Sequence, residues 1–146
     1  MAKRIHECVL LHVEDDDGTA CLFRLALQEI GVWPQFFRVT DGEQAMAFLL
    51  QNGPYSSAPR PNLVLLDLNL PGKSGLDVLS EMKSNLGLRD IKVVVFSTST
   101  LPYDRERSLQ LGADDYLYKD GHFEAFVKVA ELLLCEKLME GGQGAD

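Results

Sequence analysis

Short apolar runs alternate along the chain with segments of helical periodicity, and this alternation constrains the fold more than any other feature. The first, third and fourth runs are apolar almost throughout, which is typical of strands covered by helices on both faces. A parallel sheet with helices between its strands is therefore predicted. The expected strands are Cys8–Val13, Phe36–Val39, Leu63–Leu66, Val93–Phe96 and Tyr116–Tyr118.

The segments between and after these runs carry apolar residues at helical spacing. The first helix is expected to end at Gly31 and the second before Asn52-Gly53. Ser74 is the expected N-cap of the third, and a short charged helix is predicted from Asp104 to Leu111. The last helix has the clearest pattern. Its expected core stripe is Phe123, Phe126, Val127, Ala130, Leu133, Leu134 and Leu138.

A chain of 146 residues fits one compact domain. We expect this domain to span residues 1–140, with residues 141–146 as a flexible glycine-rich tail. Right-handed crossovers through five helices then predict an α/β fold of the flavodoxin-like, doubly wound type. Its five-stranded parallel sheet has the strand order 2-1-3-4-5.

Composition and charge exclude several classes of protein. No apolar run approaches the roughly 20 residues of a membrane span, and the N-terminus lacks a secretory signal, so a cytoplasmic location is predicted. The net charge of −8 argues against nucleic-acid binding, which needs a basic face. It favours a cation or a protein partner instead. The three cysteines lack metal-ligand spacing and are interpreted as reduced packing residues.

Polar side chains stand at the ends of four predicted strands. Glu14 and Asp15 follow the first strand, Asp67 the third, Ser97 the fourth and Lys119 the fifth. Ligands of doubly wound sheets bind beyond the carboxyl ends of the strands, where the predicted order brings these side chains together. The sequence therefore predicts a functional site at this edge of the sheet.

Three carboxylates in one cleft repel one another unless a cation neutralises them. We predict Mg²⁺, with Mn²⁺ as an alternative ion, bound by Glu14, Asp15, Asp67 and the backbone carbonyl of Asn69. An aspartate beside such an ion can attack phosphorus and form an acyl phosphate, while Lys119 offsets the charge on the phosphoryl oxygens. No glycine-rich nucleotide loop accompanies these residues.

Four motifs, in order and spacing, resemble the receiver domain of two-component response regulators. The resemblance covers roughly residues 7–138. The motifs are Val13–Asp16, Leu65–Gly72, Val95–Ser97 and Tyr116–Lys119. In that family the corresponding positions are the acidic pair, the phosphoacceptor, the hydroxyl and aromatic switches and the phosphate-binding lysine. By resemblance these are Glu14 with Asp15, Asp67, Ser97, Tyr116 and Lys119.

The resemblance implies a phosphorelay protein that takes a phosphoryl group from a sensor histidine kinase. It implies no enzyme activity beyond Mg²⁺-dependent self-phosphorylation and autodephosphorylation. Residues 66–71 and 97–99 are similar to regulators paired with phytochrome-type kinases. The switched surface would contact a downstream protein that the sequence does not identify. A homodimer through the fourth helix, fifth strand and fifth helix would bury Val129, Leu132 and Cys135, which lie off the main stripe.

Two positions depart from the family pattern. Asp120 stands where proline usually follows the lysine, often through a cis bond, so the Lys119–Asp120 peptide is either cis or trans. Thr98 stands where a smaller residue is common, and with Ser99 it is expected to modulate access to Asp67.

Two other functions stay open. One is a receiver-like interaction module that no longer uses phosphate, for which Asp120 is the best argument. The other is a phosphatase of the haloacid-dehalogenase type, which also forms an aspartyl phosphate. Those enzymes carry a second aspartate two residues after the nucleophile, but Asn69 stands there and cannot act as a general acid.

Residues near the first strand and helix have structural interpretations. Asp16 and Asp17 are expected to cap the first helix rather than bind metal. His12 is predicted to be a hydrogen-bonded core residue, and Trp33 to pack at the end of that helix.

Overall fold

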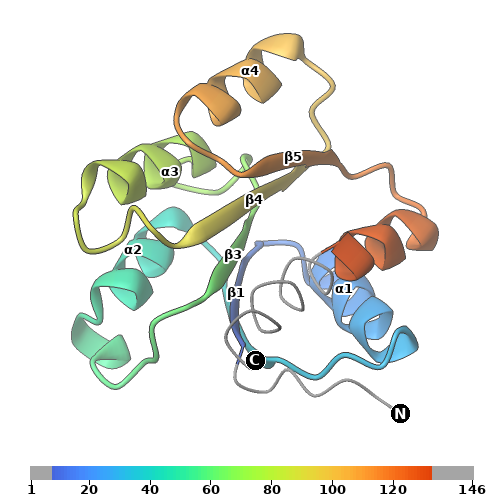
Figure 1. Cartoon of the computed structure of the whole chain (residues 1–146), viewed down its shortest axis with the longest axis horizontal. Coiled ribbons are helices and arrows are strands. Elements are labelled where there is room, and N and C mark those ends of the chain that lie inside the picture. The colour runs from blue at the N-terminus through green and yellow to red at the C-terminus, as the bar shows by residue number, and fades with distance from the viewer. Residues whose placement is uncertain (1–7, 133–146) are drawn as a thin grey trace, which may run out of the picture.

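The computed structural model describes residues 8–132. Five parallel strands form one sheet in the order β2-β1-β3-β4-β5, as the sequence predicts (Figure 1). The strands are β1 (Val9–Val13), β2 (Gln35–Val39), β3 (Leu63–Leu66), β4 (Lys92–Ser97) and β5 (Asp115–Tyr118). The helices are α1 (Asp17–Glu29), α2 (Gly42–Leu50), a 3-10 turn (Gly53–Tyr55), α3 (Gly75–Ser84), α4 (Pro102–Gln110) and a final helix at residues 123–132.

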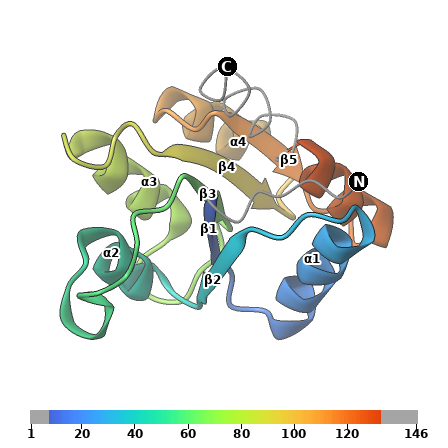
Figure 2. The ribbon, with the colours of Figure 1, turned by 60° about the horizontal axis from the view of Figure 1, so that its bottom comes forward.

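The helices cover both faces of the sheet. α1 and the final helix lie on one face, and α2 and α3 on the other (Figure 2). Successive strand residues point to opposite faces. Leu11 and Val13 therefore join the core beneath α2 and α3, whereas Leu10 joins the core beneath α1 and the final helix. Burial of β1, β3 and β4 between these layers explains their almost unbroken apolar sequence.

The helix boundaries follow local chemistry. Ser74 accepts a hydrogen bond from the backbone of Asp77 and caps α3, as predicted. Gly31, just beyond α1, has φ of 75°, a left-handed conformation that suits glycine. α4 begins at Pro102, two residues before the predicted start, because proline lacks the N–H that the first helical turn leaves unpaired.

Three predictions about apolar side chains are wrong. Val129 is buried against the sheet, whereas Phe123 is 38% exposed, so the core-facing stripe of the final helix is displaced from the predicted one. Trp33 is 53% exposed because Val32 takes the core position after α1. Of the second apolar face that the predicted homodimer would bury, Leu132 is exposed but Val129 is not. Residues 133–146, which include Cys135 and the predicted tail, lie outside the described residues.

His12 lies in the core, as predicted, but it is not fully hydrogen-bonded. The ring lies tilted against Phe23 and edge-on to Phe36, at centroid distances of 5.1 and 5.9 Å. Its Nδ1 atom is buried and has no hydrogen-bond partner within residues 8–132. Burial lowers the pKa of His12 to about 3, so the ring is neutral at physiological pH.

Gly75 brings the first turn of α3 against the end of β3. Its N–H donates to the carbonyl of Leu68 at 3.0 Å. An added Cβ would lie 2.6 Å from Leu68 Cα and closer still to the carbonyl oxygen of Asp67. Real side chains do not approach backbone this closely, so only glycine fits here.

We expect Gly75→Ala to destabilise the fold by about 1–3 kcal/mol, because the methyl group must displace the Asp67 backbone. Helix propensity alone would give the opposite sign, a gain of about 1 kcal/mol. Urea unfolding measures the difference. Gly18→Ala in α1 is the control, since its Cβ meets nothing nearer than 3.4 Å. Equal stabilisation of both variants would contradict the steric argument.

Candidate functional site

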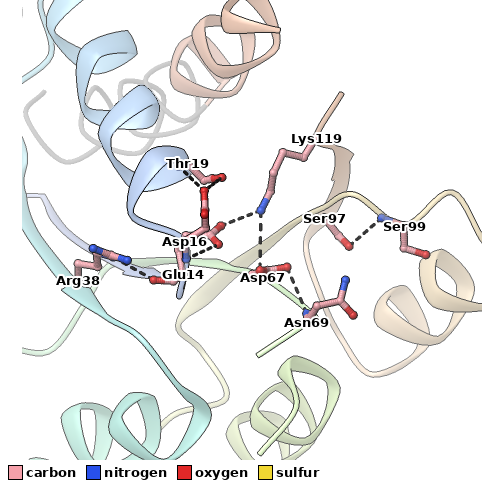
Figure 3. A network of polar contacts seen from close by, with 9 residues as sticks. All are labelled: Glu14, Asp16, Thr19, Arg38, Asp67, Asn69, Ser97, Ser99 and Lys119. Carbon is pink, nitrogen blue, oxygen red and sulfur yellow. Dashed lines mark hydrogen bonds and ion pairs between the residues drawn. The ribbon is translucent and has the colours of Figure 1, made fainter. Parts of the chain in front are cut away.

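Predicted site residues meet at the carboxyl edge of the sheet, where Figure 3 shows Glu14, Asp67 and Lys119 side by side. One oxygen from each of Glu14, Asp15 and Asp67 lies within 4.8 Å of the others. Glu14 and Asp15 follow β1, and Asp67 follows β3, its neighbour in the sheet. Adjacent strands of a doubly wound sheet thus bring together carboxylates more than 50 residues apart.

The carboxylates differ in their exposure to solvent. Glu14 and Asp67 are 2% and 6% exposed, whereas Asp15 is exposed. Burial is the main cause that raises the pKa of both Glu14 and Asp67, and the ammonium of Lys119 opposes it. The site therefore holds two desolvated acids that favour a nearby cation.

Lys119 comes from the end of β5 and provides that positive charge. Its Nζ lies 2.7 Å from Glu14 Oε1 and 3.8 Å from Asp67 Oδ2, and 5.4 Å from the centre of the Phe96 ring. The side chain is only 7% exposed. The Lys119–Asp120 peptide is trans, which settles the alternative that the sequence left open. A trans bond thus presents the ammonium to both buried carboxylates.

The donor set fits a hard divalent cation. Carboxylate oxygens are the ligands that Mg²⁺ and Mn²⁺ prefer, and these three residues bring one each within 4.8 Å of the others. The backbone N–H of Asn69 donates to Asp67 Oδ1 at 3.2 Å, which orients the aspartate. Whether the carbonyl of Asn69 also binds the ion stays a prediction.

The segment after β4 connects Ser97 to Tyr116 and α4 through Ser99. Ser97 Oγ accepts a hydrogen bond from the Ser99 N–H at 3.1 Å. The Tyr116 hydroxyl donates to the Ser99 carbonyl at 2.8 Å, and Ser99 Oγ donates to Asp104 at 2.6 Å. Ser97 is fully buried and Thr98 is exposed. A displacement of Ser97 would therefore disturb the bonds that hold Tyr116 and α4.

Two residues make contacts at the turn that follows β1. Asp16 caps α1 by accepting from the Thr19 N–H and hydroxyl, both at 2.8 Å, as predicted. These bonds lower the pKa of Asp16. Arg38 on β2 donates to the Glu14 carbonyl at 2.9 Å, a contact that sequence reasoning missed. The only indication of this contact in the sequence is that Arg38 is a charged residue inside the otherwise apolar predicted strand Phe36–Val39.

Comparisons with known proteins agree with this arrangement. The model of the response regulator receiver domain family matches residues 10–131. The chain belongs to this family. A receiver domain is a phosphoacceptor signalling domain, so the comparison favours this interpretation over a phosphatase.

Two relatives resemble the receiver domain over most of their length. The response regulator Rcp1 of Synechocystis is 41% identical over 123 residues, which cover 84% of each chain. The Mn²⁺-bound form of Rcp1 has a TM-score of 0.79, with 84% of this chain and 88% of that one covered. The phosphorylated cyanobacterial phytochrome response regulator RcpA is 38% identical, with a TM-score of 0.81 and coverage of 86% and 90%. Within residues 8–132, no helix has the length and apolar character needed to cross a membrane.

Proposed function

We propose that Asp67 is the phosphoacceptor of this receiver domain and that Glu14, Asp15 and Asp67 bind the required divalent cation. The observation that carries the proposal is the cluster of these three carboxylates within 4.8 Å, with the Lys119 ammonium beside it. This combination supports phosphoryl transfer over a purely structural role, because the buried carboxylates of Glu14 and Asp67 cost stability unless they are neutralised.

The proposed step is a transfer between a histidine and an aspartate. An Asp67 carboxylate oxygen attacks phosphorus, the bond from phosphorus to the imidazole nitrogen of a kinase phosphohistidine breaks, and that nitrogen retains the electron pair. Lys119 Nζ, which lies 3.8 Å from Asp67 Oδ2, pairs with a phosphoryl oxygen. The Ser97 hydroxyl donates a hydrogen bond to another oxygen.

The ion would neutralise negative charge on the phosphoryl oxygens and orient them towards Asp67. We favour Mg²⁺, with Mn²⁺ as the alternative supported by the Mn²⁺-bound form of the related Rcp1. The same residues would support self-phosphorylation from small phosphodonors and autodephosphorylation by water. Thr98 and Ser99, which directly follow β4, are proposed to modulate the rate of both reactions.

The donor is proposed to be a cytoplasmic sensor histidine kinase of the phytochrome type. Support comes from the similarity to RcpA, a cyanobacterial phytochrome response regulator. Phosphorylation would draw Ser97 inwards and release its bond to Ser99, to which Tyr116 is also attached. The affected surface comprises α4, β5 and the final helix. It would bind a downstream protein or a second copy of this chain, and Leu132 and Tyr118 are exposed on it.

Incubation of the purified protein with acetyl phosphate and Mg²⁺ tests the proposal. We expect the mass of one phosphoryl group to be added, to be lost with hydroxylamine as an acyl phosphate is, and to require the metal. Borohydride reduction followed by peptide mapping should locate the label at Asp67. A protein that stays unmodified would refute the proposed role of Asp67 and favour the phosphate-independent module. Phosphorylation of another residue would also refute that role.

A further inference from the structure

Arg38 links the edge strand β2 to the acidic turn after β1. Its Nε donates to the carbonyl oxygen of Glu14 at 2.9 Å (Figure 3). Its Nη1 pairs with Asp17 Oδ1 at 2.8 Å. The Arg38 side chain is 24% exposed, whereas that of Asp17 is 93% exposed. The bond to Glu14 is therefore the better shielded of the two.

The two peptide groups of Glu14 are both held by β2. The Glu14 N–H donates to the carbonyl of Val39 at 3.0 Å, and the Glu14 carbonyl accepts from Arg38. The carboxylate is fixed separately, by Lys119 Nζ at Oε1 and by the Asp16 N–H at Oε2. The Arg38 bond is the one that orients the peptide plane between Glu14 and Asp15.

That orientation matters most for Asp15. Its side chain is exposed and makes no hydrogen bond to any residue that the structure describes, yet one of its oxygens lies within the carboxylate cluster. The direction of the Asp15 carboxylate is therefore set by the backbone that carries it. A guanidinium bonded to the preceding carbonyl restricts that backbone.

We propose that Arg38 is a positioning residue for the metal ligands Glu14 and Asp15, an inference that rests on the proposed function. Groups that orient metal ligands typically contribute about 10- to 100-fold to metal affinity. The charge of Arg38 acts in the opposite direction, because a nearby cation repels the metal ion. The sign of the change in affinity on substitution thus separates positioning from simple electrostatics.

The test is Mn²⁺ binding to the unphosphorylated full chain, followed by the electron paramagnetic resonance signal of the free ion. We expect Arg38→Gln to weaken binding about tenfold, although it removes a repelling charge. Arg38→Lys should also weaken it, because an ammonium cannot reproduce the planar fork of the guanidinium. Asp17→Asn is the matched control: it breaks the exposed ion pair, keeps the bond to Glu14 and should bind Mn²⁺ as the wild type does.

A kinetic measurement accompanies the binding data. With acetyl phosphate, Arg38→Gln should need about ten times more Mg²⁺ for half-maximal phosphorylation but reach nearly the wild-type rate at saturation. Arg38→Gln and Arg38→Lys are both expected to fold. Arg38 Nη2 is buried without a hydrogen-bond partner in residues 8–132, and either substitution removes this unpaired donor and its cost to stability. If Arg38→Gln is unfolded, the Mn²⁺ affinity of Arg38→Lys tests the positioning role instead.

Unchanged or tighter Mn²⁺ binding by Arg38→Gln, or wild-type binding by Arg38→Lys, would overturn the positioning role. In either case a phosphorylated wild type would leave the proposed function standing. A wild type that neither binds Mn²⁺ nor becomes phosphorylated would overturn both proposals together.

Discussion

Asp67→Asn should abolish phosphorylation by acetyl phosphate and, without metal, raise the melting temperature near neutral pH. The amide cannot form an acyl phosphate, which explains the first effect. The second follows from burial, which raises the pKa of Asp67 above its ordinary value of 3.8. A carboxylate with a raised pKa binds its proton more tightly in the folded state. The ionised form therefore costs stability as the pH rises through and above about 4.

Melting curves with and without metal measure this prediction. The advantage of the variant should disappear near pH 3, where Asp67 is protonated in both states of the wild type. Added Mg²⁺ should stabilise the wild type more than the variant. Asp90→Asn is the control, because it removes one exposed carboxylate that precedes β4, at the opposite end of this strand from the site. A variant less stable than the wild type at neutral pH would show that burial does not dominate at Asp67.

Lys119→Met should reduce phosphorylation about 100-fold at saturating Mg²⁺, the usual cost of losing one group that stabilises a developing anion. It should also lower the metal-free free energy of unfolding at neutral pH by about 3 kcal/mol, because Glu14 is left charged and buried without its partner. Initial rates of phosphorylation and urea unfolding measure the two effects. The loss of stability should shrink in acid, where the raised pKa of Glu14 allows it to take up a proton.

The double variant Glu14→Gln/Lys119→Met separates the two causes. It removes both charges of the buried pair, so most of the lost stability should return while phosphorylation stays low. If the double variant is as unstable as Lys119→Met, the contact of the Lys119 ammonium with the Phe96 ring, rather than its pairing with Glu14, is the main contribution of this residue to stability.

The sheet and the position of the site could be predicted because they depend on strand periodicity and chain connectivity. Strands β1, β3 and β4 are buried on both faces, which leaves an unbroken apolar sequence. Once the strand order is known, residues that follow those strands must meet at one edge. Glu14, Asp15, Asp67 and Lys119 meet there, as predicted from their place after a strand.

The remaining features depend on side-chain packing in three dimensions. Helical spacing does not distinguish Phe123 from Val129 at the core, since a small rotation of the final helix exchanges them. Val32 and Trp33 are both large and apolar, and only the direction of the turn decides which is buried. Arg38 contacts the backbone of Glu14, and a bond to a carbonyl leaves no trace in the type of residue that accepts it.

Close contact between Gly75 and the peptide of Asp67 makes the site more rigid on its α3 side than on its α4 side. On the α3 side, backbone lies directly against backbone, so the peptide of Asp67 cannot shift towards α3 when the side chain is phosphorylated. On the α4 side, the connection runs through single hydrogen bonds at Ser99, which exchange at low cost. A structural change at Asp67 would thus leave α3 in place and move the segment that follows β4.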